Sequence, residues 1–323
     1  METVIKVDKL IKQYHGSTEN AVEHISFEVN EGEFFSFLGP NGSGKTTTIS
    51  ILTTLLSKTN GEVTIAGFDV VKKAKQVRHN IGILFQNLSV DPELTFEENI
   101  RLHVSLYGIY GYRPLYRLMP REYKLRLQEL AVMMDMGELL FKKLKTFSGG
   151  MKRKVEIIRS LMHQPKILFL DEPTQGLDAA SRHSFWKYIQ KIRKEKSVTI
   201  FLTTHYLAEA ETADKVCMIH RGKIAMFGTP DEIKSRLMIE KSMYIDAVNR
   251  NELKSELSNL EVDFSETTDG LKVIYQALTP QDLITKINTP LKKLHVLQPT
   301  LEEAYIDLMR RKDKEENINV NSN

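Results

Sequence analysis

Apolar and polar positions follow two different periodicities along this chain. Mostly apolar runs occupy residues 34–38, 81–85, 166–170 and 198–204, and such runs are typical of parallel strands that are buried on both faces. Between the runs, apolar residues recur at helical spacing, as in the series Met151, Val155, Ile158 and Met162. Strands that alternate with helices predict an α/β fold with a mostly parallel core sheet.

The first 230 residues divide into parts of different character. Residues 1–84 carry strand signals, and residues from about 87 to 162 are expected to be mostly helical. Residues 166–204 return to a strand–helix–strand pattern, and residues 215–227 predict a hairpin that turns at Arg221-Gly222. The middle part therefore resembles a helical insertion in a strand-rich core.

A second unit is predicted after Thr229-Pro230, which is a helix-start signal. We expect a helix to about residue 239, and then six elements in the order β-α-β-β-α-β, the split βαβ arrangement of a small α+β domain. The expected elements are a strand at 243–247, a helix at 251–259, a hairpin of 261–265 and 271–276, a helix at 280–288 and a strand at 294–297.

These patterns give a domain plan for the whole chain. The first domain is expected at 1–228, with its helical part at about 87–162, and a connecting helix at 229–241. The α+β domain is expected at 242–311, where its last helix opens at 298–305. The charged and then Asn-rich tail at 312–323 is expected to be disordered.

Composition narrows the class of protein. The chain has 323 residues, of which 41% are hydrophobic and 27% charged, as in ordinary soluble proteins, and its net charge of +3 is too small to indicate nucleic-acid binding. No stretch approaches the ~20 apolar residues of a membrane-spanning helix, and the N-terminus lacks a signal-peptide pattern. The single cysteine, Cys217, lies in an apolar run, so we expect it to be buried in a protein of a reducing compartment.

A phosphate-binding loop is predicted between the run at 34–38 and a helix expected at 47–56. Glycines allow such a loop to turn tightly so that backbone N–H groups converge on phosphate oxygens. Lys45 adds a positive charge, and the Thr46 hydroxyl can bind Mg²⁺. The alternative is a glycine-rich turn with a surface lysine. The loop reads Gly39, Pro40, Asn41, Gly42, Ser43, Gly44, Lys45, Thr46.

Two further motifs follow in the chain. Asp171 and Glu172 close the apolar run at 166–170, at the end of a strand where α/β sheets bind ligands. Asp171 is expected to reach Mg²⁺ and Glu172 to polarise a water, whereas the alternative is a solvated acidic turn. Ser148 is a good N-cap, but the two glycines after it are unusual for a cap alone and allow a phosphate or another backbone to approach.

With these motifs in this order, residues 3–230 resemble the ATP-binding-cassette (ABC) family. In that family, Ser148, Gly149 and Gly150 correspond to the signature motif that touches the ATP held by a partner subunit. Phe147 and Met151 depart from its usual Leu and Gln. Met151 with the basic residues after it resembles the export branch, and the C-terminal ending resembles exporter ATPases of the daunorubicin-resistance (ABC-2) type.

The resemblance also implies the remaining site residues. Tyr14 corresponds to the aromatic that stacks on adenine, Gln86 to the glutamine that links Mg²⁺ and water to the membrane partner, Asp178 to the loop that crosses the dimer interface, and His205 to the switch histidine. Core packing remains the alternative for Tyr14, and a structural role remains the alternative for His205. The implied catalytic residues are Glu172, His205 and Gln86, the implied metal ligands are Thr46, Gln86 and Asp171, and the implied ATP-binding residues are Tyr14, the loop 39–46 and Thr47.

The resemblance implies a fold and a function as well. It implies a P-loop NTPase domain with a β-rich N-terminal subdomain and an inserted helical subdomain, which hydrolyses ATP with Mg²⁺ to drive export. The partners would be a separate transmembrane permease and a second copy of the chain or a homologous subunit in a head-to-tail dimer, at the cytoplasmic face of the membrane and without nucleic acid. The alternatives are a soluble cassette ATPase acting on ribosomes or DNA and a regulatory cassette with weak hydrolysis.

Overall fold

The computed structural model describes residues 2–236, 242–268, 270–275, 279–297, 300–306 and 308. The chain forms two compact units, Met1–Thr229 and Pro230–Asn323. The first unit contains two sheets and the second contains one, and each unit has its own hydrophobic core.

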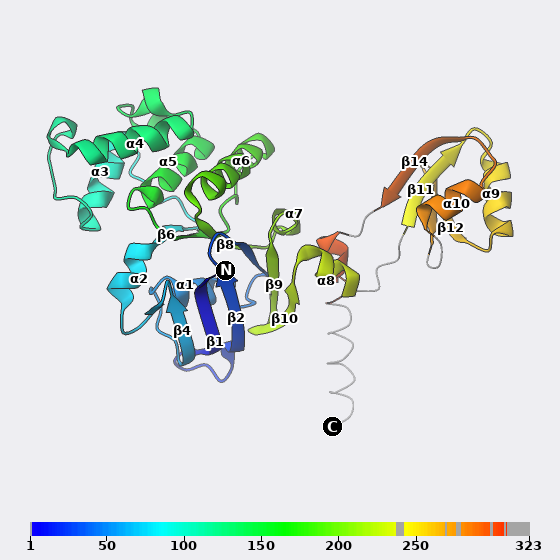
Figure 1. The fold of residues 1–323 in the computed structure, drawn as a ribbon, viewed down its shortest axis with the longest axis horizontal. Coiled ribbons are helices and arrows are strands. Elements are labelled where there is room, and N and C mark those ends of the chain that lie inside the picture. Colours follow the sequence, from blue (N-terminus) through cyan, green and yellow to red (C-terminus); the bar gives the residue numbers. More distant parts are fainter. Residues whose placement is uncertain are drawn as a thin grey trace. The chain divides into compact units, whose positions relative to one another are not determined.

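The first unit is organised around a six-stranded sheet in the order β10-β9-β3-β8-β7-β6 (Figure 1). Every neighbouring pair is parallel except β9 with β10, which confirms the expected mostly parallel core sheet. The apolar runs of the sequence lie here because both faces of the central strands are buried. The strands are β3 (Phe34–Leu38), β6 (Ile81–Leu84), β7 (Ile167–Asp171), β8 (Thr199–Thr204), β9 (Lys215–His220) and β10 (Lys223–Gly228).

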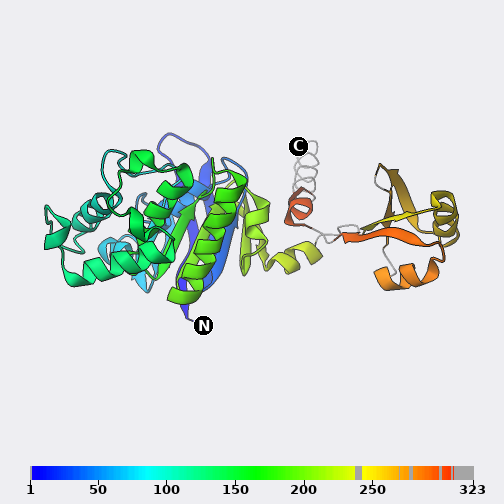
Figure 2. The same ribbon diagram turned by 90° about the horizontal axis from the view of Figure 1, so that it is seen from above.

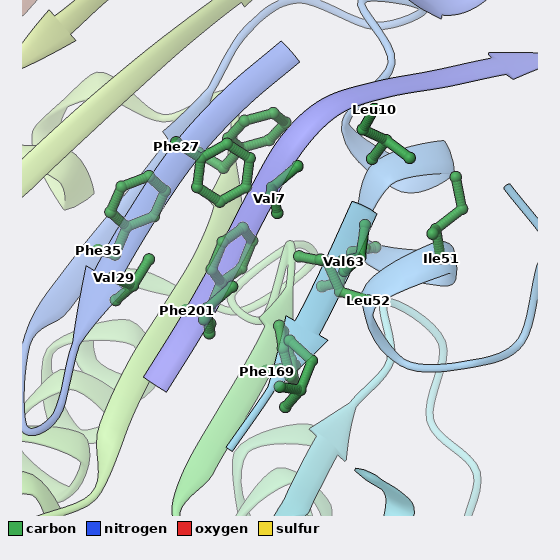
Figure 3. Close-up of a cluster of buried hydrophobic side chains, with 14 of the residues drawn as sticks. Val7, Leu10, Phe27, Val29, Phe35, Ile51, Leu52, Val63, Phe169 and Phe201 are labelled. Atoms are coloured by element: carbon green, nitrogen blue, oxygen red, sulfur yellow. The ribbon is translucent and has the colours of Figure 1, made fainter. Parts of the chain in front are cut away.

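A smaller antiparallel sheet packs on one face of the core sheet. Its strands are β1 (Thr3–Gln13), β2 (Asn20–Asn30), β4 (Asn60–Ile65) and β5 (Phe68–Asp69), in the order β2-β1-β4-β5. Figure 3 shows Phe27 and Val63 from this sheet against Phe35, Phe169 and Phe201 from the core sheet. The rings of Phe35 and Phe201 stack with centroids 5.2 Å apart. Ile51 and Leu52 of the first helix lie in the same cluster. Because side chains alternate along a strand, Phe34 points to the opposite face of the core sheet, where its ring stacks on that of Trp186 with centroids 5.7 Å apart.

Helices complete the first unit, and α3, α4 and α5 gather in one lobe beside the sheets (Figures 1 and 2). The Thr95 hydroxyl caps α3, and the Glu98 carboxylate accepts from the Thr95 N–H in return, which gives that helix a defined start. The helices are α1 (Lys45–Leu52), α2 (Ala74–Asn80), α3 (Phe96–Leu106), α4 (Arg121–Met133), α5 (Gly149–Leu161), α6 (Ala179–Lys196) and α7 (Leu207–Ala210), with 3₁₀ turns at Tyr116–Leu118, Gly137–Leu139 and Leu144–Thr146.

Helix α1 differs from the expected span of 47–56, because it begins at Lys45 and ends at Leu52. The Thr53 hydroxyl donates to the Ile49 carbonyl, and Thr54 adopts a left-handed φ of 64°. The N–H of Leu55 then donates back to the Ser50 carbonyl, so the chain leaves the helix one turn early.

The second unit is a four-stranded antiparallel sheet in the order β12-β13-β11-β14. This order places β13 between β11 and β12, as in a split βαβ arrangement, and confirms the expected α+β character. Its core contains Met243 and Ile245 of β11 with Leu253 and Leu257 of α9. The elements are α8 (Pro230–Arg236), β11 (Ser242–Ala247), α9 (Arg250–Asn259), β12 (Asp263–Thr267), β13 (Gly270–Ile274), α10 (Pro280–Lys286) and β14 (Leu291–Leu297).

Several boundaries in this unit differ from the sequence expectation: β13 ends at Ile274 rather than 276, and α10 ends at Lys286 rather than 288. Strand β12 begins at Asp263 rather than 261, because the N–H groups of Glu261 and Val262 still donate to carbonyls of the last turn of α9. Strand β14 begins at Leu291 rather than 294. The end of the expected connecting helix at 237–241, the start of the last helix at 298–299 and the expected disordered tail at 312–323 lie outside the described residues.

Candidate functional site

The phosphate-loop residues form the turn between β3 and α1. Gly44 is the N-cap of α1 with φ 108°, and a Cβ there would lie 2.6 Å from the Ala21 carbonyl oxygen, so only glycine fits. Lys45 is buried, and its Nζ donates to the carbonyls of Gly39 at 2.7 Å and Pro40 at 3.0 Å. Burial lowers the pKa of Lys45, against the opposing effect of the nearby Glu172 carboxylate.

The two predicted acids lie at the end of β7, close to this lysine. The Nζ of Lys45 is 3.5 Å from Oε1 of Glu172. Asp171 accepts a hydrogen bond from the Thr203 hydroxyl, and burial raises the pKa of its carboxyl group. Both carboxyl groups are buried, which excludes the solvated acidic turn.

His205 follows the neighbouring strand β8. Its Nδ1 lies 3.1 Å from Oε2 of Glu172, so one carboxylate contacts both Lys45 and His205. The parallel register of β7 and β8 aligns Asp171 with Thr203, which brings the residues after both strands together. Glu172 has a left-handed φ of 43°, and its N–H donates to the Thr203 carbonyl at 3.0 Å.

Three other predicted residues, Tyr14, Thr46 and Gln86, lie on exposed surface of the same unit. Tyr14 is 45% exposed, and its hydroxyl is 3.2 Å from the Thr47 hydroxyl near the start of α1, so core packing does not account for it. Thr46 is exposed beside it. The Gln86 amide follows β6 and donates to the side-chain oxygen of Gln175 in the loop after β7.

The signature and dimer-loop residues form two adjacent helix starts. Ser148 caps α5 by accepting from the Met151 N–H at 3.3 Å, and Ser148 and Gly149 are exposed. Asp178 caps α6 and accepts from the Ser181 N–H at 2.9 Å. A Cβ on Gly150 would lie 2.9 Å from the Ser181 hydroxyl, so this glycine permits the close approach of the two helices.

Oxygen atoms that suit Mg²⁺ lie at the phosphate loop. This ion prefers carboxylate and hydroxyl oxygens and is commonly held by one or two carboxylates together with substrate phosphates. Asp171 supplies a buried carboxylate and Thr46 an exposed hydroxyl. Among the described residues, no group of three His, Cys, Asp or Glu side chains could hold a metal ion.

Sequence reasoning missed two buried charged groups beside the site. Glu209 accepts hydrogen bonds from the Thr174 and Thr204 hydroxyls and from the Trp186 indole at 3.3 Å, and it thereby fixes the loops after β7 and β8. Arg153 of α5 donates to the carbonyls of Phe85 and Pro173. In the sequence, the only sign of such a group was a charged residue in a helix whose other inward-facing residues are mostly apolar. A charge that is buried at such a position needs hydrogen-bond or ion-pair partners.

Comparison with known proteins identifies the family. The family described as "ABC transporter" matches residues 22–175. The daunorubicin/doxorubicin resistance ATP-binding protein DrrA of Streptomyces peucetius is 37% identical over 314 residues, which is 94% of this chain and 92% of that protein. The probable multidrug ABC transporter ATP-binding protein YbhF of Escherichia coli (strain K12) is 34% identical over 235 residues, 73% of this chain; the matched part spans only 39% of that relative's length.

A solved structure agrees with this comparison. The dimeric, post-hydrolysis structure of the ATP-binding cassette MJ0796 bound to ADP and Pi is 27% identical, with a TM-score of 0.59 over 70% of this chain and 98% of that one. The expected P-loop cassette fold is therefore confirmed. In the part of the chain that the structure describes, no helix is both long and apolar enough to cross a bilayer. The fold, the motif geometry and the sequence matches agree that the chain belongs to the ABC transporter family, among its ATP-binding proteins.

Proposed function

We propose that this chain hydrolyses ATP to ADP and phosphate as the nucleotide-binding subunit of an exporter. The observation that carries the proposal is the convergence of Lys45, Glu172 and His205 at the ends of β3, β7 and β8. Phosphoryl transfer requires mainly positioning and neutralisation of charge, and this cluster offers a carboxylate within contact distance of both a cation and an imidazole.

Each member of the cluster has a distinct role in this proposal. Lys45 binds the β- and γ-phosphates, Glu172 accepts a proton from the attacking water, and His205 orients the γ-phosphate. Tyr14 stacks on adenine, which its exposed ring beside α1 supports. The residues of the loop 39–46 and Thr47 surround the phosphates.

Mg²⁺ is the metal that this donor set suits. Thr46 and Asp171 would hold it, with Gln86 joining them through its side-chain oxygen. When bound, the ion neutralises charge that develops on the phosphate oxygens. The amide of Gln86 already contacts the loop after β7, so its position depends on the same region as that of Glu172.

The active form is proposed to be a head-to-tail dimer with a second copy or a homologous subunit. Ser148, Gly149 and Gly150 would contact the ATP held by the partner, and Asp178 would lie at the interface. Exposure of Ser148 and Gly149 supports this, as does the dimeric form of the similar cassette structure. Closure of the dimer would be the two-state element that ATP stabilises.

A separate permease at the membrane completes the proposed assembly. Support for export comes from the relative whose name gives daunorubicin and doxorubicin resistance. We place the subunit at the cytoplasmic face of the membrane, without a nucleic-acid partner, and we place the cassette at 1–228, the connecting helix at 229–241 and the accessory domain at 242–311.

Phosphate release from ATP by the purified chain tests the proposal. Hydrolysis should require Mg²⁺, stop with EDTA, and rise more steeply than linearly with protein concentration, because two chains form each site. Lys45→Ala should abolish hydrolysis, whereas Lys6→Ala, which removes an exposed lysine paired with Glu28, should not. Wild-type protein that releases no phosphate under these conditions would favour the regulatory cassette. Co-purification with ribosomes rather than with membranes would favour the soluble alternative.

A further inference from the structure

Arg153 joins two separate loops of the cassette to its own helix, α5. Its Nε donates to the Pro173 carbonyl at 2.8 Å, and its Nη1 donates to the Phe85 carbonyl at 2.6 Å and to Glu156 Oε2 at 2.8 Å. The side chain is 3% exposed, and Glu156 is 1% exposed. A buried guanidinium in this geometry fixes its acceptors in direction as well as distance.

One of those acceptors lies beside the proposed catalytic base. Glu172 has a left-handed backbone, which costs a non-glycine residue energy and persists only when its surroundings hold it. On the upstream side, the Glu172 N–H donates to the Thr203 carbonyl at 3.0 Å. On the downstream side, the Pro173 carbonyl accepts from Arg153. The turn that carries the base is therefore held from β8 at one end and from α5 at the other.

A second acceptor lies in the segment that contains Gln86, and the third, Glu156 of α5, bonds to the same segment. Phe85 directly precedes Gln86, and its carbonyl accepts from Arg153. Glu156 Oε1 accepts from the Ser89 N–H at 2.7 Å and from its hydroxyl at 3.0 Å. Arg159, further along α5, donates to the Ser89 carbonyl at 2.7 Å. Residues 85–89 are thus bonded to the same helix that holds Pro173.

We propose that Arg153 is a positioning residue that couples the segment 85–89 and helix α5 to the orientation of Glu172. Movement of α5 or of the Gln86 segment would then change the geometry of the base through the Pro173 carbonyl, without a contact to the substrate. This inference rests on the proposed ATP hydrolysis and adds to it a route by which the helical part of the cassette controls the chemical step.

The test is Arg153→Lys in the full chain, with Arg126→Lys as its matched control. Arg126 lies in α4 and donates to Glu129 at 3.0 Å and to the Leu161 carbonyl at 3.1 Å. Like Arg153, it therefore bonds to a Glu three residues further along its helix and to a main-chain carbonyl. Unlike Arg153, it contacts neither motif loop through these bonds. A lysine at 153 can still neutralise Glu156 but cannot reach all three acceptors at once. We expect kcat to fall about 10- to 100-fold, as for a small misplacement of a catalytic group, while KM for ATP changes by less than about threefold.

Hydrogen exchange supplies a readout that does not depend on turnover. Amides in 171–174 and 85–89 should exchange faster in Arg153→Lys than in wild type, and Arg126→Lys should leave both segments unchanged. A second variant, Arg153→Met with Glu156→Met, removes both buried charges together and so avoids leaving one of them unpaired. It should show the same loss of kcat with ATP binding retained.

The outcomes separate this inference from the proposed function. Arg153→Lys with kcat within about twofold of wild type, or with ATP affinity and melting temperature lost in parallel with kcat, overturns the positioning role. Loss of kcat in Arg126→Lys equal to that in Arg153→Lys also overturns it, because general weakening of the helical part would then explain both. Wild-type protein without hydrolysis contradicts the proposed function instead, and the exchange measurement still tests the link between α5 and the turn at Glu172.

Discussion

Glu172→Gln should abolish turnover while leaving ATP binding intact or stronger. The carboxylate contacts Lys45 at 3.5 Å and His205 at 3.1 Å, so it is placed between the proposed phosphate-binding cation and the proposed switch residue. The amide of the variant would keep the shape of the side chain but could not accept a proton from water. The substitution therefore separates the two roles that the carboxylate has in the structure.

The expected magnitudes follow from these two contacts. A positioned general base typically contributes about 10²–10⁴-fold to a rate, so its loss should raise the barrier by about 3–5 kcal/mol. For binding, unit charges about 4 Å apart attract by about 4 kcal/mol near a protein surface, before the costs of desolvation. Phosphate oxygens must compete with Glu172 for Lys45, and the negative carboxylate also repels them, so its neutralisation should not weaken ATP binding.

Steady-state phosphate release and titration with a fluorescent ATP analogue measure the two effects separately. Glu33→Gln is the matched control, because Glu33 is also buried and its Oε1 lies 3.0 Å from Nζ of Lys215, outside the site. Hydrolysis by Glu172→Gln at the wild-type rate would remove this residue from the base role. ATP affinity that falls by about tenfold or more in Glu172→Gln, but not in Glu33→Gln, would refute the competition for Lys45.

The remaining predictions concern the phosphate cation, the dimer and the second unit. Lys45→Ala should weaken ATP binding about 10- to 100-fold, the value of a charge-assisted hydrogen bond, and equal affinity in the same titration would exclude Lys45 from the phosphates. Ser148→Arg should block hydrolysis but not ATP binding to the monomer, whereas normal hydrolysis by the dilute chain would show a self-contained site. Asp246 accepts from Arg250 at 2.6 Å and lies 3.0 Å from Lys292, and these hydrogen bonds hold its pKa below the usual 3.8. Because folding lowers the pKa of Asp246, its contacts with Arg250 and Lys292 stabilise the folded state above about pH 4. This stabilisation is lost as the pH falls through the lower pKa of the folded state. Asp246→Asn should therefore speed hydrogen exchange of β11 at about pH 7 and remove its acid dependence below about pH 4, and unchanged exchange at neutral pH would contradict this.

The strands of the core sheet could be predicted because each is a run of consecutive, mostly apolar residues. The run at 34–38 coincides with β3, since a central parallel strand needs apolar side chains on both faces. Helix α1 was predicted too long because its end depends on the left-handed backbone of Thr54 and on a hydrogen bond to the Ser50 carbonyl. Neither Thr nor Ser at these positions is a residue type that signals the end of a helix. Local apolar pattern thus predicted elements better than it predicted their ends.

In the site, too, some features could be predicted from local sequence patterns, whereas others depend on tertiary contacts. The phosphate loop and the two acids after β7 could be found from their own neighbours in the sequence, whereas Gln86 and His205 were indicated only by the family resemblance. The 3.1 Å contact between Glu172 and His205 depends on the pairing of β7 with β8. Arg153 gave no clear signal, because two of its acceptors are main-chain carbonyls, and any residue type can supply a carbonyl. Only the folded chain shows that this charge is buried among the loops of two different motifs.

Side chains from three different parts of the cassette hold Glu172 or the residue next to it, so each of these parts could regulate the proposed base. Lys45 contacts it from the phosphate loop, His205 from the end of β8, and Arg153 holds the next residue from α5. Because a left-handed backbone at a non-glycine residue persists only when its surroundings hold it, the loss of any of these contacts would alter the position of Glu172. Proton transfer requires hydrogen-bond reach to the attacking water, so a shift of less than an ångström at any one contact would change the rate. Under the proposed function, changes at the nucleotide, at His205 and at the helical lobe would therefore all act on one carboxylate, with no need for a separate pathway to each.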